Sequence, residues 1–185
     1  TPELYTVYKS SAASDVYKRQ VPGMTAAPDI DDAPIERCIA AWHRHLRGEL
    51  PGGLDAILHE DCVFLSPIVF TPQQGREITK LYLTAAGGTL GGEDGDVAAS
   101  FADGGSNTAS GSTGGGFRYV KEILQGHHAM LEFETTVDGK YANGVDIITC
   151  DDDGLITEFK VMMRPLQAIN AVHARMKAML EQLSS

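Results

Sequence analysis

The segment GVDIITCDDDGLITEFKVMM, residues 144–163, decides the fold because it reads as two strands joined by a tight turn. Apolar residues recur on both sides of 151–154, and an aspartate-rich connection that ends in glycine is typical of a β-hairpin. Asp146 is an ionisable side chain in an otherwise apolar strand. A carboxylate on a half-buried strand is costly to desolvate unless a partner pairs with it or it stays protonated. The position of Asp146 therefore predicts a small-molecule pocket.

Composition limits the class of protein and of partner. The chain has 185 residues, of which 43% are hydrophobic, so it can bury one sizeable core and is expected to form a single domain. It has 15 Lys and Arg against 25 Asp and Glu, and a formal charge of -10 argues against nucleic acid or an anionic membrane as a partner. No apolar run is long enough to span a bilayer. Cys38, Cys62 and Cys150 occur singly and without metal-ligand spacing, which predicts reduced thiols in a cytoplasmic protein.

Two segments differ in composition from the rest of the chain. Residues 1–23 lack sustained periodicity and resemble translated adaptor sequence, so we expect a non-native or disordered tail and a natural start at Met24. Residues 24–185 then form the single domain. Residues 87–116 are rich in Gly, Ser, Asp and Thr and predict a flexible insertion, with a short strand over 97–101. A phosphate-binding loop is disfavoured there because the glycines lack a strand-to-helix turn and a lysine.

The spacing of apolar residues predicts four helices. The clearest has Pro34 in its first turn and carries one apolar stripe, with Asp31 or Asp32 as its cap. The others are a short helix at 54–58, a helix that opens with the capping sequence at 71–74, and an amphipathic helix after Pro165. The last helix is interpreted as a cover for the core, with a lid over a pocket mouth as the alternative.

Strand-forming runs fill most of the remaining chain. Residues 62–70 form one such run, which is interrupted by Pro67; proline cannot donate to a sheet and implies a bend or an edge. After the insertion, four runs connected by short turns predict an antiparallel meander at 117–124, 127–137, 140–150 and 155–164. The predicted helices come first along the chain and the meander follows. This order favours an α+β domain with helices packed on one face of a curved sheet.

In their order and spacing, these elements resemble the nuclear transport factor 2-like superfamily, which includes the SnoaL-like polyketide cyclases and the ketosteroid isomerases. The resemblance covers about Pro34 to Arg164 and is strongest from His127 onward, through the Gly-Val-Asp and Asp-Gly motifs of the hairpin. It implies a cone-shaped, curved, mixed or antiparallel sheet with the N-terminal helices on its concave side and an extra C-terminal helix. It also implies an apolar cavity inside the cone and a homodimer formed through the outer sheet face.

The resemblance carries over to three residues of a possible site. Asp146 stands where ketosteroid isomerases keep the protonated aspartic acid of an oxyanion hole, and Trp42 stands near the position of their tyrosine donor. The general base of that family is an aspartate before a proline, whereas this chain has Ser66, which argues against steroid isomerisation by that mechanism. Limonene epoxide hydrolases use an Asp-Arg-Asp set, for which Arg164 is present but a second carboxylate is not evident. A SnoaL-like cyclase needs a single acidic residue and is the enzyme class least contradicted.

Strand alternation and the resemblance together define the candidate site. We predict Asp146 as the catalytic residue and expect a substrate-binding set around it: Trp42, Phe64, Ser66, Tyr82, Ile148, Phe159, Val161 and Met163. The alternative for Asp146 is a carboxylate that accepts hydrogen bonds and serves only packing specificity.

Three hypotheses for function stay open. The first is a SnoaL-like acid/base isomerase, cyclase or hydrolase that acts on an apolar carbonyl or cyclic substrate. The second is a non-catalytic binding module with the same cavity, and the third is a dimerising accessory domain whose cavity is filled by its own side chains. Metal, nucleotide and flavin signatures are absent, so no cofactor and no metal are predicted. His43 and His45 are interpreted as surface residues.

Overall fold

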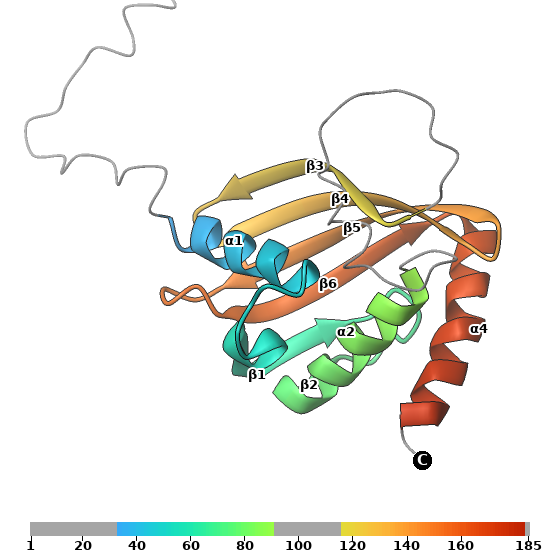
Figure 1. Ribbon diagram of the computed structural model, residues 1–185, viewed down its shortest axis with the longest axis horizontal. Coiled ribbons are helices and arrows are strands. Elements are labelled where there is room, and N and C mark those ends of the chain that lie inside the picture. Colours follow the sequence, from blue (N-terminus) through green and yellow to red (C-terminus); the bar gives the residue numbers. More distant parts are fainter. Residues whose placement is uncertain (1–32, 91–115, 184–185) are drawn as a thin grey trace, which may run out of the picture. The chain divides into compact units, whose positions relative to one another are not determined.

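The structure is a computed structural model that describes residues 33–90 and 116–183. Within these ranges, six strands form one open sheet in the order β2-β1-β6-β5-β4-β3 (Figure 1). β1 runs parallel to β6, and all other neighbouring strands are antiparallel, so the sheet is mixed as predicted. The strands are β1 (Leu58–Leu65), β2 (Gln73–Gln74), β3 (Arg118–Gln125), β4 (His128–Val137), β5 (Lys140–Cys150) and β6 (Ile156–Arg164).

The helices confirm the predicted α+β cone with an extra C-terminal helix. α1 (Pro34–Leu46) and α2 (Arg76–Leu90) cover one face of the sheet, and α4 (Leu166–Leu183) packs against α2 and against strands β4, β5 and β6 (Figure 1). A 3-10 turn, η4 (Gly53–Ala56), lies between α1 and β1. The main core lies between the sheet and α1, η4 and α2.

The apolar stripe of α1 holds that helix against the sheet. Ile35, Cys38, Ile39 and Trp42 are all buried, as expected for residues repeated at helical spacing. The N-cap position is Ala33, which forms no side-chain cap hydrogen bond. The expected aspartate cap at 31 or 32 lies outside the described residues. Pro34 at the start fits, because the first N–H groups of a helix have no intrahelical partner.

The predicted short helix and the first strand differ from the structure. The helix expected at 54–58 is only the turn η4, because Leu58 already pairs with Ile156 in the sheet. β1 ends at Leu65, before Pro67, and does not continue to residue 70. Sheet pairing with β6 therefore prevails over the local helical spacing of the apolar residues.

The beginning of α2 also differs from the prediction. Gln73 and Gln74, expected to open the helix, form β2 and pair with β1. Gly75 follows with a φ of 97°, a conformation that favours glycine and separates the strand from the helix. At its other end α2 reaches Leu90, so its last turn occupies the expected start of the insertion. The expected strand at 97–101 and the tail at 1–23 lie outside the described residues.

The predicted meander is confirmed, and its inner face carries the site. The four strand boundaries shift by at most one residue. Along β5, burial alternates so that Gly144, Asp146 and Ile148 face the helices. Gly144 is required at its position because a Cβ there would collide with the ring of Phe133 and lie 2.7 Å from the carbonyl oxygen of Met162. The ring of Phe133 thus occupies space above Gly144.

α4 covers the far end of the core. Its buried side chains include Ala168, Ala171, Val172 and Met176, whereas Leu166, the first residue of the helix, is 71% exposed. Arg175 pairs with Asp138 of the β4–β5 turn at 2.7 Å and ties the helix to the hairpin. The position of α4 supports its interpretation as a core element.

Candidate functional site

The candidate site is a cavity of about 240 Å³ between the inner sheet face and helices α1 and α2. Most of its wall is apolar and aromatic. Three lining side chains can titrate: His45 from α1, Tyr119 from β3 and Asp146 from β5. The other lining residues are Trp42, Leu46, Leu54, Phe64, Leu83, Thr84, Ala86, Gly87, Leu90, Phe117, Phe159 and Val161.

A directed chain of hydrogen bonds forms the polar part of the wall. Trp42 Nε1 donates to the hydroxyl oxygen of Tyr119 at 3.0 Å. The Tyr119 hydroxyl in turn donates to Oδ2 of Asp146 at 2.6 Å. Because indole can only donate, the proton of Tyr119 must point at Asp146 for both bonds to form. This arrangement leaves Oδ1 of Asp146 available for a further partner, because among the described residues the carboxyl accepts one hydrogen bond, from Tyr119 to Oδ2.

The register of three strands brings Tyr119 and Asp146 together. Tyr119 lies opposite Phe133 of β4, and Phe133 lies opposite Gly144 of β5, two residues before Asp146 on the same face. A register shift follows directly after Tyr119 in β3. The tyrosine side chain therefore reaches across β4 to a carboxylate that is distant in sequence.

Burial makes the Asp146 carboxyl unusual. The residue is 5% exposed, and desolvation raises the pKa of its carboxyl from 3.8 to about 7, against the opposing effect of the Tyr119 hydrogen bond. Burial, followed by the charge of Asp146, raises the pKa of Tyr119 well above its ordinary value. Tyr119 thus stays a donor at neutral pH, while Asp146 is present in both protonated and ionised forms.

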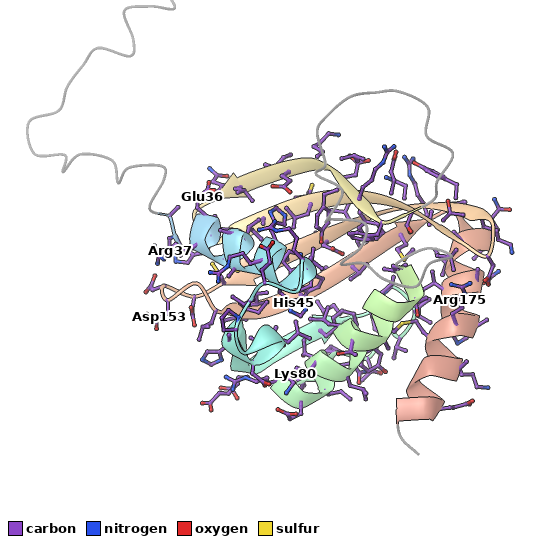
Figure 2. The ribbon with its side chains drawn as sticks, in the orientation of Figure 1. Glu36, Arg37, His45, Lys80, Asp153 and Arg175 are labelled. Carbon is purple, nitrogen blue, oxygen red and sulfur yellow. The ribbon has the colours of Figure 1, made fainter. Side chains whose placement is uncertain are left out.

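His45 also belongs to the cavity wall, which corrects its interpretation as a surface residue. It lies near the C-terminal end of α1 (Figure 2), and its ring centroid is 5.5 Å from that of Trp42. Burial lowers the pKa of the His45 imidazole below its ordinary value of 6.5, so the ring is neutral at pH 7. His43 is half-buried too, and its Nε2 lies 3.0 Å from a carboxylate oxygen of Glu122.

The structure brings together five of the predicted site residues. Asp146, Trp42, Phe64, Phe159 and Val161 all line the cavity. The Phe159 ring packs against both aromatic neighbours, with centroids 5.1 Å from Trp42 and 6.2 Å from Phe64. These contacts form an apolar part of the cavity wall, to which β1 and β6 contribute the residues predicted from the alternation of side chains along each strand.

The other four predicted residues lie elsewhere. Ser66 and Tyr82 line a second hollow, of about 370 Å³, together with residues of α4. The Ser66 hydroxyl accepts hydrogen bonds from the backbone N–H groups of Ile68 and Val69 at 3.1 and 3.2 Å, so it stabilises a turn and does not look into the cavity. Ile148 is fully buried in the core, and Met163 is half-buried; neither lines the cavity.

Sequence reasoning missed Tyr119, Phe117 and His45. A signal for the first two exists, because aromatic residues two apart in a strand share one face. The edge-on packing of their rings, with centroids 5.1 Å apart, reflects that spacing. For His45 the apolar stripe of α1 is a weak signal, because the histidine is not one of the buried residues of that stripe.

Three further expectations concern Arg164, metal ions and membranes. Arg164 Nε donates to Asn143 Oδ1 at 2.7 Å, so Arg164 does not join Asp146 in an Asp-Arg-Asp set. Among residues 33–90 and 116–183, no group of three or more His, Cys, Asp or Glu side chains is placed to hold a metal ion. In the same part of the chain, no helix has the length and apolar character needed to cross a membrane.

Comparison with known proteins identifies structural relatives. No protein-family model matches the sequence, and no curated protein matches it significantly. The chain is similar to a steroid delta-isomerase from Pseudomonas aeruginosa, at 26% identity and a TM-score of 0.64, over 83% of this chain and 96% of that chain. It is similar to an uncharacterized bacterial protein with a cystatin-like fold from Silicibacter pomeroyi DSS-3, at 27% identity and a TM-score of 0.58, over 76% and 83% of the chains. An NTF2-like protein of unknown function from Mesorhizobium loti shares the fold at 16% identity and a TM-score of 0.52, over 77% and 100%.

Proposed function

We propose that this protein, a member of the nuclear transport factor 2-like superfamily, binds a small apolar molecule through a carbonyl oxygen and donates a hydrogen bond or proton from Asp146 to that oxygen. The reaction class is acid/base isomerisation or cyclisation. The observation that carries the proposal is the Asp146 carboxyl, buried in the wall of an apolar cavity and held by Tyr119 at 2.6 Å.

The electrostatics of the carboxyl support a donor role. A protonated Asp146 accepts from Tyr119 through Oδ2 and can donate through Oδ1 to a ligand in the cavity. A pKa of about 7 keeps a useful fraction of this acid form at neutral pH. As an oxyanion develops on the ligand, a donor that is already oriented in a water-poor cavity stabilises it more than water would.

The size of the cavity limits the substrate class. Its volume of about 240 Å³ is below the roughly 300–1,000 Å³ of clefts that hold drug-sized ligands. A ketone with one or two rings therefore suits the cavity better than a four-ring steroid. The replacement of the expected aspartate base by Ser66, whose hydroxyl is held by backbone N–H groups, also favours a substrate other than a steroid.

The test uses 1-indanone, a two-ring ketone that can accept but not donate hydrogen bonds at its oxygen. Trp42 is the one tryptophan of the chain and lines the cavity, so its fluorescence reports occupancy. We expect saturable binding that weakens roughly tenfold as pH rises through about 7, because ionised Asp146 loses its donor proton. Indane, which lacks the oxygen, should bind with no such pH dependence.

The variant Asp146→Asn separates the proposed role from simple apolar binding. Its amide keeps a donor but does not titrate, so 1-indanone binding should become independent of pH. Absence of saturable binding, or the same pH-independent affinity in the wild-type protein, would overturn the proposal. Binding that follows the expected pH dependence without any chemistry on the ketone would favour the alternative, a non-catalytic binding module.

We also propose that two copies of the chain associate through the outer sheet face. Ile123, Met130 and Ile147 lie opposite one another in register across β3, β4 and β5, and the first two are exposed. Charged side chains of both signs flank this row, and Lys121 pairs with Glu132 at 2.9 Å. Two copies can therefore pack face to face without bringing like charges together.

Sedimentation velocity tests the association. The wild-type protein should sediment as a dimer, and Met130→Glu should shift it to a monomer because a charge would be buried in the interface. Leu166→Glu, a change at an exposed residue of α4, serves as the control and should leave the dimer intact. A wild-type monomer at micromolar concentration would contradict this proposal.

A further inference from the structure

We propose that His45 is the base that removes a proton from a carbon of the substrate, while Asp146, oriented by Tyr119, donates to the substrate oxygen. This inference rests on the proposed function, because it assigns the second proton-transfer group of the same cavity. His45 comes from α1, and Asp146 comes from the sheet, so the two groups approach a bound ligand from different walls.

The imidazole of His45 is free to contact a ligand. It lines the cavity, and burial is the single cause that moves its pKa, with no charged or hydrogen-bonded partner among the described residues. Its ring packs against Trp42, which limits its rotation. A neutral imidazole with an unprotonated ring nitrogen is the side chain best suited to accept a proton near neutral pH.

The need for such a base follows from two other residues. Ser66 lies outside the cavity wall and its hydroxyl accepts a hydrogen bond from a backbone N–H group of a turn, so it cannot act on a ligand in the cavity. Asp146 cannot be both the acid that holds the oxygen and the base that attacks the carbon in the same step. Within the described part of the wall, His45 is the remaining group that can accept a proton at neutral pH, because Tyr119 holds its own proton.

The reaction step balances without a co-reactant. The unprotonated nitrogen of His45 takes a proton from the carbon next to the carbonyl group, and the C–H electron pair forms a carbon–carbon double bond. The carbonyl π pair moves to oxygen, where the Asp146 O–H bond donates to the developing charge. The imidazolium then returns the proton to the same carbon, which gives exchange. In a substrate with a second carbon–carbon double bond conjugated to the enolate, it can return the proton to the far end of that system, and this outcome is an isomerisation.

The groups around His45 define the expected pH dependence. From the sheet, Asp146 and Tyr119 face the cavity, while Arg44 of α1 and the C-cap residue Arg47 neighbour His45 in the sequence. The wall residues from η4 and α2 carry no charge. Proton removal should rise as His45 deprotonates, below pH 6.5, and fall as Asp146 ionises, near pH 7. The plot of exchange rate against pH is therefore a narrow bell. Its two apparent midpoints belong to His45 and Asp146 as a coupled pair.

The experiment measures hydrogen–deuterium exchange at the carbon next to the carbonyl group of 1-indanone, in deuterated water, by proton NMR. The wild-type protein should accelerate exchange with the bell-shaped profile. His45→Gln should lower the second-order rate constant by roughly 100-fold or more and remove the rising limb, while 1-indanone still binds. His128→Gln, at an exposed residue of the outer face, is the matched control and should change nothing.

A second measurement needs no substitution. Addition of 1-indanone to the wild-type protein should shift the imidazole nitrogen resonances of His45 and leave those of His128 in place. Exchange that proceeds unchanged in His45→Gln, or unshifted His45 resonances on binding, overturns the role of His45. Binding with no exchange by the wild-type protein also overturns it but leaves the proposed binding function standing, whereas absence of any binding removes both.

Discussion

The Tyr119 hydroxyl donates to Oδ2 of Asp146 at 2.6 Å from the opposite side of strand β4. This bond joins the edge strand of the sheet to its centre and ends a chain that begins at the indole of Trp42. The relationship has two consequences. It orients the carboxyl in the cavity, and it partly offsets the cost of burying it.

Removal of the tyrosine hydroxyl should raise the Asp146 pKa further. In Tyr119→Phe the ionised carboxylate loses its one donor among the described residues, and burial acts unopposed, so the pKa should move above about 7. Carbon NMR of the labelled carboxyl measures this value. Tyr141→Phe, which removes a hydroxyl bound to Glu134 on the outer face, is the control. An Asp146 pKa that falls or stays constant in Tyr119→Phe would contradict the account.

The buried carboxyl should impose a pH dependence on stability. Its pKa is about 7 in the folded state against 3.8 as the ordinary value, so the folded state binds the proton more tightly. The stabilisation is fully present below pH 3.8 and is lost as pH rises through about 7. Relative to Asp146→Asn, the wild-type protein should lose on the order of 4 kcal/mol of unfolding free energy between pH 4 and 8. Urea unfolding of both proteins measures it, and parallel curves would refute the claim.

Gly144 should tolerate no side chain. Gly144→Ala places a methyl group into the ring of Phe133, so we expect a loss of about 1–3 kcal/mol in unfolding free energy. Gly87→Ala is the control, because a Cβ at that helical position meets nothing within 4 Å and alanine favours helix. Thermal unfolding compares the two variants. Equal stability of both would show that Phe133 moves aside without cost.

Ser66 should matter for stability and not for the ligand. Ser66→Ala removes the acceptor of two backbone N–H groups and should cost about 1 kcal/mol of unfolding free energy. Its affinity for 1-indanone should equal that of the wild-type protein, because the hydroxyl does not line the cavity. A clear loss of affinity without a change in stability would place Ser66 in the site after all.

Part of this site could be predicted from periodicity alone. Because successive strand residues alternate between the two faces of a sheet, the hairpin at 144–163 predicts that Asp146, Phe159 and Val161 lie on the same face. Trp42 followed from the helical stripe of α1 in the same way. These predictions hold because both repeats are local properties of the chain.

The remainder depends on pairings between distant segments. Tyr119 meets Asp146 only because β3 and β5 both pair with β4, and the register shift after Tyr119 cannot be read from its neighbours. Gln73 and Gln74 look like a helix start but complete a two-residue strand on β1. Ser66 looks like a wall residue by alternation, yet Pro67 ends the strand there and the hydroxyl is used by the turn.

The titration of the Asp146 carboxyl by carbon NMR tests the central claim most directly. The account predicts a midpoint near 7 in the free protein, which rises further when 1-indanone binds, because the bound ketone oxygen favours the protonated acid. A midpoint close to 3.8, unchanged by 1-indanone, would mean that the carboxyl is solvated and uninvolved, and it would contradict the account.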